Sequence, residues 1–509
     1  RDHRLEVLAG YTVQKVSFES NGANANGFSS NLAQTVNFGT VQSAYSGESG
    51  NSLISYLARA NYSYKDRYLL TATVRRDGSS RFGTNNLWGV FPSVAAAWNV
   101  SNERFMEDMK AIDHLKIRAS YGVTGSNFIG DFTSKSSLRS LNSSFGNNSV
   151  VGFVNADPGN PDLSWEKSKQ TDIGLDLGLM NRVSVTLDYF NNISNDLLLN
   201  VNVPPSLGYG GNLANIGSMK KWGYEATVNA EIIKNKDFSW SVGFNVSHLK
   251  QKVLKLGPTG APLRQFFNVL VTEIGGPLEQ EHALKQIGIL TQKDIDNGVA
   301  RKVGDKAGDY KFLDANNDGF IDAFNGADGV LVGDNNPRWL YGINTSLTYK
   351  NFRFSALLQG QAGAKMLDFV YQIFSLHSRN TNMDTYFFDG RYISEAQPGN
   401  GLVPRAGYND EGAVSSWEVQ KTDYLRIRNV NLSYTFPASI SRKIFLNDLR
   451  AYISVENLYT FKKYRGGNPQ ATRNGFDTQI FGDHRTLSLN SVATAPLPRI
   501  FTLGINFSF

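Results

Sequence analysis

The chain has 509 residues with a formal net charge of +6, and it contains no basic run, so nucleic acid is not expected as a partner. It contains no cysteine, which excludes disulfides and thiolate metal sites. A helical membrane protein would need stretches of about 20 apolar residues. The longest apolar patch, at 94–98, is far too short.

Strand-length segments that alternate apolar with polar or small residues follow one another along the whole chain. They lie near 3–19, 51–64, 67–75, 86–99, 114–124, 168–179, 182–195, 218–231, 238–249, 338–349, 351–362, 422–436, 448–460 and 497–509. Each of these about 14 segments is about as long as a tilted strand needs to cross a bilayer. Within 422–436 the alternation slips between Ile427 and Val430, which predicts a β-bulge.

The last segment shows the alternation most clearly. Its apolar face consists of Phe501, Leu503, Ile505, Phe507 and Phe509. The residues between them are small or polar, so the two faces of the strand suit two different media. A membrane β-barrel has lipid outside and water inside and needs such strands. A soluble β-sandwich also shows this alternation, so the period alone leaves both folds open.

The lengths of the connections between the strands distinguish a membrane barrel from a soluble β fold. Tight turns are expected at 65–66, 180–182, 235–237 and 350–351, and long polar connections near 20–50, 125–166, 196–217, 250–337, 363–421 and 461–496. Short turns that alternate with long extracellular loops are typical of outer-membrane barrels. A sandwich or a propeller fits poorly, because the connections are too long and no repeat of fixed period is present. We therefore predict an all-β fold, a transmembrane antiparallel β-barrel.

Several distinctive segments occur in order along nearly the whole chain. They are RYLLTATVRRDGSSRFG at 67–83, WGVFPS at 88–93, AAW at 96–98, NPDLSWEK at 160–167, NIGSM at 215–219, YLRIRNV at 424–430 and ENLYT at 456–460. These segments resemble those of the SusC/RagA family of TonB-dependent transporters.

The resemblance implies an outer-membrane barrel of about 22 strands whose lumen is closed by an N-terminal plug domain. Residues 1–509 are then expected to form the C-terminal part of that barrel. The plug, the TonB box and about eight early strands would lie upstream of Arg1. The chain opens close to its first strand without a signal peptide, as expected for a piece of a longer protein.

The resemblance also implies a function, which is import of an oligosaccharide or a peptide across the outer membrane. The implied partners are a SusD-like surface lipoprotein, the TonB complex acting through the missing N-terminal region, and the surrounding lipid. No enzyme signature is present, since the six histidines are scattered without metal-ligand spacing. Two alternatives stay open: a passive porin or structural outer-membrane scaffold, and a soluble carbohydrate-binding β protein.

One loop carries a metal-binding pattern, D-x-N-x-D-G, at 314–319. The candidate oxygen ligands are Asp314, Asn316, Asp318, the Phe320 carbonyl and Asp322. An all-oxygen set favours a structural Ca²⁺ or Mg²⁺. The twelfth position is Asn325 where a calcium loop has Glu, although Asp328 lies close behind it. The alternative is a turn in which Asp and Asn side chains bond their own backbone. No other cofactor is expected.

Aromatic side chains in the long connections are the other candidate contacts. They are Phe266, Phe267, Tyr386, Phe387, Phe388, Tyr408 and Trp417. Such rings suit stacking on sugars, reception of apolar peptide side chains, or contact with a lid protein. The alternative is that they pack the loops onto the mouth of the barrel.

Overall fold

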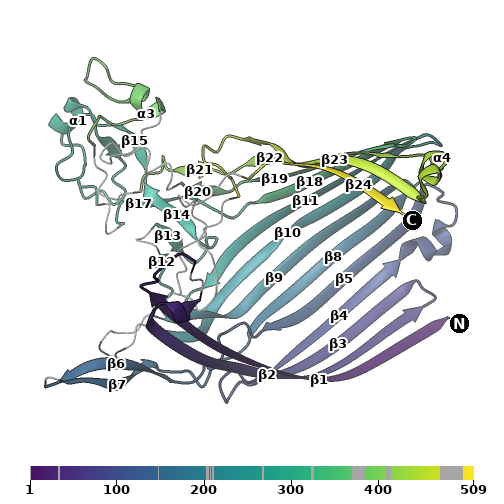
Figure 1. Ribbon diagram of the computed structural model, residues 1–509, viewed down its shortest axis with the longest axis horizontal. Coiled ribbons are helices and arrows are strands. Elements are labelled where there is room, and N and C mark those ends of the chain that lie inside the picture. Colours follow the sequence, from purple (N-terminus) through teal and green to yellow (C-terminus); the bar gives the residue numbers. More distant parts are fainter. Residues whose placement is uncertain are drawn as a thin grey trace.

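The computed structural model describes residues 2–32, 35–146, 148–201, 206, 208, 211–265, 269–322, 326–368, 385–408, 414–470 and 497–509. Its main element is a 14-stranded antiparallel sheet, strongly curved in Figure 1. In spatial order the strands are β1 (His3–Asn26), β2 (Thr40–Tyr64), β3 (Tyr68–Ser79), β4 (Trp88–Asn99), β5 (Ile112–Ser126), β8 (Glu166–Leu179), β9 (Val183–Val201), β10 (Asn212–Lys234), β11 (Phe238–Lys255), β18 (Trp339–Tyr349), β19 (Phe352–Ala362), β22 (Tyr424–Thr435), β23 (Asp448–Lys462) and β24 (Ile500–Ser508).

These are the fourteen strands that the alternation predicted, so the predicted all-β sheet is confirmed. Strands β1 and β24 form the two edges of the sheet, and among the described residues they do not pair with each other. Figure 1 shows the N-terminal and C-terminal strands at opposite edges of the curved sheet. No helix among the described residues combines the length and the apolar character that crossing a membrane requires.

The two faces of the sheet differ as the sequence predicted. In β24, Leu503 is 83% exposed and lies opposite Ile453, while Thr502 lies opposite Ser454 on the other face. Residues directly opposite each other in an antiparallel pair share one face. Apolar rows therefore share one face of the sheet, and small or polar side chains share the other. In the predicted barrel the apolar face is the convex side and the polar face is the concave side. In water such apolar rows would be costly, whereas in lipid they match their surroundings.

Tight turns close one end of the sheet, as predicted. Lys65 and Asp66 join β2 to β3 with φ of 51° and 52°, and Met180 and Asn181 join β8 to β9 with φ of 53° and 51°. Positive φ at both central residues is the hairpin geometry that matches the twist of the flanking strands. The opposite end, where the long connections lie, is called the mouth below.

Several strands run further into the predicted connections than the alternation indicated. Strands β1 and β2 continue as a paired ribbon to Asn26 and Thr40, inside the expected 20–50 connection. This stretch is rich in Gly, Ser and Asn, so it has no apolar face to mark it as strand. Backbone pairing extends the ladder there, together with side-chain bonds such as the one from Asn24 to Ser43.

The long connections contain structure of their own. The 125–166 connection holds the hairpin β6 (Ser137–Phe145) and β7 (Asn148–Asp157). The 250–337 connection holds β12 (Leu263–Gln265), β13 (Leu270–Thr272), β14 (Gln280–Leu284), β15 (Gln286–Ile289), α1 (Gln292–Asp296), β16 (Tyr310–Phe312) and β17 (Gly329–Asp334). The 363–421 connection holds β20 (Lys365–Leu367), α3 (Thr385–Gly390) and β21 (Val419–Lys421), and much of 461–496 lies outside the described residues.

The predicted β-bulge in β22 is confirmed. Against β19, the adjacent residues Leu357 and Leu358 pair with Asn429 and Ile427, which leaves Arg428 as the extra residue of β22. The Arg428 guanidinium donates to the Asn457 side-chain oxygen at 2.6 Å. This bond holds the bulged residue in place, and the slip in the apolar period was its sequence signal.

A buried apolar cluster fixes the 125–166 connection to the mouth. It consists of Phe82, Phe91, Ile129, Leu163 and Trp165. The Leu163 side chain is fully buried, and its carbonyl accepts the Gly83 amide at 3.1 Å. The Trp165 indole donates to the Leu87 carbonyl at 3.1 Å. Packing and backbone bonds together tie the end of this connection to β3 and β4.

We predict that Leu163→Ala lowers the free energy of unfolding by about 2–5 kcal/mol, because a buried leucine leaves a cavity when it is truncated. Denaturant unfolding of the detergent-solubilised protein measures the effect. Leu138→Ala, on the exposed β6 strand, is the matched control and should change stability by less than about 0.5 kcal/mol. Equal losses in the two variants would contradict the role given to the cluster.

Candidate functional site

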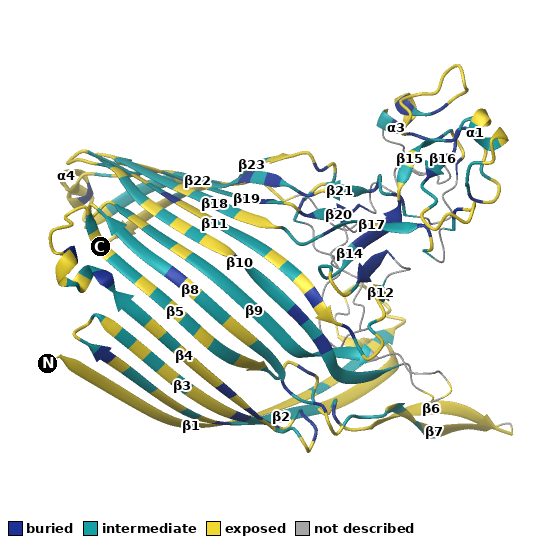
Figure 2. Ribbon diagram, turned by 180° about the vertical axis from the view of Figure 1, so that it is seen from behind, coloured by how far each residue is buried: buried dark blue, intermediate teal, exposed yellow. Residues whose placement is uncertain are grey.

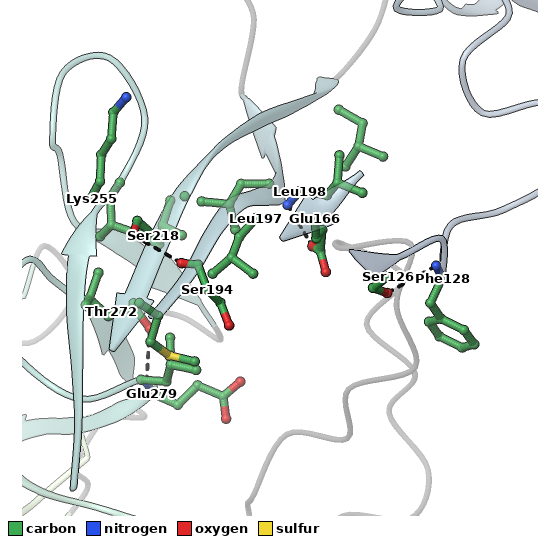
Figure 3. Close-up of a pocket in the computed structure, with 18 of the residues that line it drawn as sticks. Ser126, Phe128, Glu166, Ser194, Leu197, Leu198, Ser218, Lys255, Thr272 and Glu279 are labelled. Atoms are coloured by element: carbon green, nitrogen blue, oxygen red, sulfur yellow. Dashed lines mark hydrogen bonds between the residues drawn. The ribbon is translucent and has the colours of Figure 1, made fainter. Parts of the chain in front are cut away.

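A pocket of about 640 Å³ lies at the mouth, where β8, β9, β10 and β11 end (Figure 3). The 126–133 segment forms one side of it, and residues of β12, β13 and the turn at 278–279 form another. Its lining includes Glu166, Ser194, Met219, Val253 and Thr272. This combination of apolar walls with a few polar groups is typical of ligand pockets.

The pocket opens on the concave side of the sheet. Met219 lies opposite Ser194 on one neighbouring strand and Val253 on the other, and all three line the pocket. Two residues further along β10, Lys221 lies opposite Asn192 and Gln251 on the same face. Because the concave side carries the polar rows, the pocket lies at the top of the polar wall.

A β-bulge in β9 shapes the apolar side of the pocket. Asp196 has a φ of 56°, and the pairing of β9 with β10 shifts register beside it. The Asn215 side chain holds the bulge by donating to the carbonyls of Ser164 and Asp196, both at 2.8 Å. Past the bulge the alternation changes phase, so Ser194 and Leu197 both line the pocket.

Two glutamates that line the pocket make hydrogen bonds beside it. The Glu166 carboxylate accepts the Leu198 amide at 2.9 Å. Glu279 has a φ of 53°, and its amide donates to the Thr272 hydroxyl at 3.0 Å. Figure 3 shows both carboxylates directed into the open space of the pocket.

Further along the concave wall, towards the tight turns, a charged group bridges three strands. The Arg118 guanidinium of β5 bonds Asp176 of β8 at 3.2 Å and Asp188 of β9 at 2.6 Å. Gly174 makes room for it, since a Cβ there would lie 2.4 Å from the guanidinium carbon. The wall below the pocket is therefore polar and internally paired at this point.

The candidate aromatic residues that the structure describes lie mostly in packed positions. Phe387 is fully buried against Val403, and Tyr386 and Trp417 pack beside them. The rings of Tyr386 and Trp417 stack at 5.7 Å, with the Arg465 guanidinium over both. These contacts correspond to the packing alternative that the sequence left open.

Tyr408 belongs to a second buried cluster with Tyr310, and its hydroxyl bonds the Lys302 ammonium at 2.9 Å. Phe388 is 59% exposed, with the Arg391 guanidinium 4.2 Å from its ring centroid. Phe266 and Phe267 lie outside the described residues. Contact of these aromatic residues with a substrate or a lid stays a prediction.

The 314–322 loop is organised by its own hydrogen bonds. Asp314 accepts the amides of Asp318 and Gly319 at 3.2 and 2.9 Å. The fully buried Asp328 accepts the amides of Ala315 and Asp322 at 3.0 and 2.7 Å, which joins the two ends of the loop.

Other contacts of the loop are also internal. Asn316 donates to the Asp318 carboxylate, which accepts the Phe320 amide. Asn325 lies outside the described residues. Within the described part of the chain, no group of three or more His, Cys, Asp or Glu side chains is placed to hold a metal. A metal at this loop therefore stays a prediction.

A buried carboxyl group lies inside the mouth structure. Glu281 of β14 is 1% exposed, and the Leu367 amide donates to one of its oxygens at 3.3 Å. Its other oxygen has no hydrogen-bond partner among the described residues. Burial raises the pKa of this carboxyl to about 8, and the nearby charges of Glu279 and Asp334 also raise it. Glu281 is therefore mainly protonated at neutral pH.

The family described as "TonB dependent receptor-like, beta-barrel" matches residues 2–458. The chain belongs to this family of TonB-dependent receptors. Its sheet is part of an outer-membrane β-barrel, which explains the exposed apolar rows on the convex side.

Curated relatives of this receptor chain share about a third of its residues. "TonB-dependent receptor P3" of Formosa agariphila is 33% identical over the whole chain and 51% of its own length. "TonB-dependent receptor SusC" of Bacteroides thetaiotaomicron is 28% identical over 92% of the chain and 44% of its own length. The chain thus spans about half the length of the curated relatives it matches.

Among solved structures, one titled "Structure of the RagAB peptide transporter" covers the whole chain with a TM-score of 0.84. At 23% identity this similarity shows the fold alone, and the chain covers 54% of that structure. The relatives and the fold together confirm the resemblance to the SusC/RagA family of TonB-dependent receptors.

The mouth pocket of this receptor chain was not predicted from the sequence. Its residues come from separate stretches between Ser126 and Asn336 that only the folded structure brings together. A signal was nevertheless present, because the segments at 160–167 and 215–219 meet through Asn215 and Ser164. The two distinctive segments therefore mark this junction.

We predict that the mouth structure loses stability as pH rises from about 4.5 to about 8, because the folded state holds Glu281 protonated and the unfolded state does not. Below about pH 4.5 both the folded and the unfolded state hold this carboxyl protonated, so it does not reduce the free energy of unfolding there. Glu281→Gln mimics the protonated form and should flatten the loss. Thermal unfolding between pH 5 and 9 measures it, and Glu395→Gln, at a group outside this buried site, is the control. An unchanged pH profile in Glu281→Gln would contradict the assignment.

Proposed function

We propose that the chain is the C-terminal barrel part of a transporter that imports an oligosaccharide or a peptide across the outer membrane. Membership of the TonB-dependent receptor family, together with a pocket at the mouth on the polar side of the barrel wall, carries this proposal. An importer needs a pocket that binds cargo at the mouth, and it needs a polar wall along which the cargo can pass.

The relatives support the partners that we propose. The relative SusC belongs to the same family, and a solved structure of similar fold is titled as a peptide transporter, RagAB. We propose a SusD-like surface lipoprotein that covers the mouth, and the TonB complex, which would act through a region preceding the chain. Cargo would be held between the lipoprotein and the plug until TonB displaces the plug.

The chain's own residues would bind and contain the cargo. The packed cluster around Trp165 and the small sheet of β12, β13, β14 and β17 build a firm rim around the pocket. Arg118 pairs with both Asp176 and Asp188, which keeps the wall polar and leaves one carboxylate charge in excess. Cargo leaving the pocket therefore meets a water-compatible surface.

We predict that uptake of the cargo by cells depends on the proton-motive force and on TonB. The measurement is accumulation of labelled oligopeptides and oligosaccharides in cells that carry the protein, with and without a functional TonB. Uptake through this protein should fall at least tenfold without TonB. Uptake that continues unchanged without TonB would show a passive porin, and no uptake of any nutrient would support a structural scaffold.

We also propose that the 314–322 loop takes up Ca²⁺ or Mg²⁺ as a structural ion. The oxygen donors of Asp314, Asn316 and Asp318 lie within one turn and bond to each other or to the same amides, which supports the proposal. Each carboxylate oxygen that accepts one amide still offers a second lone pair to a cation.

For a dissociation constant on the order of 1 mM, 10 mM calcium should stabilise the protein by about 1.4 kcal/mol. The measurement is the midpoint of thermal unfolding with and without calcium or magnesium. Asp318→Asn should remove the shift, whereas Asp296→Asn, in the short helix α1, should keep it. Absence of any shift at 10 mM of either ion in the unmodified protein would overturn the metal proposal.

A further inference from the structure

We propose that the connection between β4 and β5, residues 100–111, is a lipid anchor that lies outside the membrane-spanning strands. Phe105 and Met109 of this connection insert among the acyl chains of the leaflet at the tight-turn end of the barrel. The inference uses the membership of the chain in a membrane barrel family and is independent of the cargo, of TonB and of the metal proposal.

The connection lies at the end of the sheet that the tight turns close (Figure 1). Two neighbouring turns hold it there. The side chains of Asn99 and Asn102 donate to the Asp66 carbonyl at 2.7 and 3.0 Å. The Met180 amide donates to the Ala111 carbonyl at 3.1 Å. Because both ends of the connection are bonded to turns, it stays close to the end of the barrel wall.

A carboxylate places the connection on the lipid-facing side of the wall. Tyr68 and Trp98 lie directly opposite each other on β3 and β4, on the face that also exposes Leu70. The Glu103 carboxylate accepts the Tyr68 hydroxyl at 2.7 Å and the Trp98 indole N–H at 3.1 Å. The Arg67 guanidinium donates to its other oxygen at 3.2 Å. Since both rings project from the apolar face, the chain around Glu103 lies on the lipid side of the barrel end.

The same rings mark the level of the membrane surface. The ring centroids of Tyr68 and Trp98 are 6.4 Å apart, those of Tyr64 and Tyr68 are 6.4 Å apart, and the His3 ring lies 4.7 Å from Tyr64. The row therefore crosses four neighbouring strands side by side. Tyr and Trp rings gather where the hydrocarbon of a bilayer meets its headgroups. A segment that is bonded to this row lies at headgroup level.

The connection presents apolar side chains at that level. Val100 and Met106 are buried, whereas Phe105 is 63% exposed and Met109 is 51% exposed. An exposed aromatic residue and an exposed methionine lose free energy in water and regain it among acyl chains. Lipid is the occupant that the position favours, because the connection continues the lipid-facing side of the wall beyond the strands.

The charged groups of the connection fit a headgroup layer. Arg104 and Lys110 are exposed and adjacent in sequence to the two apolar residues. Long basic side chains reach from an apolar surface to lipid phosphates. Glu107 and Asp108 are exposed as well, so these four charges cancel. Insertion should therefore depend on apolar contact, and a zwitterionic phospholipid should be sufficient.

The test measures the depth of spin labels in the full-length protein reconstituted into phosphatidylcholine vesicles. Residues 1–509 contain no cysteine, so each cysteine variant adds one label to this part of the protein. The readout is the ratio of collisions with membrane-dissolved oxygen to collisions with a water-soluble nickel chelate. This ratio should be at least about threefold higher for Phe105→Cys and Met109→Cys than for Asp108→Cys, the matched control. Equal ratios at the three positions would overturn the inference.

A cross-linking arm separates lipid from a protein partner. The photoreactive amino acid benzoylphenylalanine replaces Phe105 in the protein in its own outer membrane, and mass spectrometry identifies what is attached after illumination. We expect a phospholipid adduct, and we expect little of it when the same amino acid replaces Asp108. A protein adduct at position 105 without a lipid adduct would overturn the lipid anchor and would identify a protein interface instead.

A variant arm tests whether Glu103 positions the anchor. Glu103→Ala removes the bonds to Tyr68, Trp98 and Arg67, so the oxygen-to-nickel ratio of the label at position 105 should fall. Glu107→Ala, on the same connection, is the control and should leave the ratio unchanged. An unchanged unfolding midpoint in both variants shows that the barrel stays folded. An equal ratio in Glu103→Ala and Glu107→Ala would overturn the positioning role of Glu103.

Discussion

The contrast between lipid on one side of the sheet and water on the other is the constraint on which the rest of the structure depends. In hydrocarbon no backbone amide or carbonyl can be left unpaired, so each strand must bond its neighbours along the membrane-spanning length. The alternation then assigns apolar side chains such as Leu503 to lipid and Thr502 to the lumen. The backbone bonds and the lipid-facing side chains are fixed by this constraint. Different kinds of side chain can therefore occur only on the inward face and in the segments beyond the membrane.

The same constraint explains how much of the fold the sequence predicted. A period of two is strongly imposed where one face meets lipid, so all fourteen strands of the main sheet and the Ile427 bulge were predicted. At the mouth the constraint ends. The ribbon of β1 and β2 beyond residue 19 has mainly Gly, Ser and Asn on both faces. The hairpin of β6 and β7 mixes apolar residues such as Leu141 and Phe153 with Ser and Asn on both faces, so neither pair of strands carries a clear period. Their structure therefore lies outside what alternation predicts.

The candidate site shows the same division. The loop at 314–322 was noticed because its ligand types stand in a fixed local spacing, and its aspartates do form a compact bonded turn. Aromatic residues such as Phe387 were candidates for substrate or lid contact because of their ring chemistry, and the structure buries Phe387 in a packed cluster. The pocket was not predicted, because no distinctive residue type or local spacing marks it in the sequence. Its residues are ordinary Leu, Ser and Glu, and their meaning arises only when the Asp196 bulge and the curvature bring distant stretches together.

The attachment of the end of the 125–166 connection has an evolutionary consequence. The segment is anchored through Leu163 and Trp165 at its end, immediately before Glu166, while the hairpin between Ser137 and Asp157 projects from the mouth (Figure 2). Substitutions, insertions or deletions in the hairpin are thus insulated from the position of Glu166. Descendants of this chain can diversify the surface of the hairpin while the position of Glu166 at the pocket stays the same.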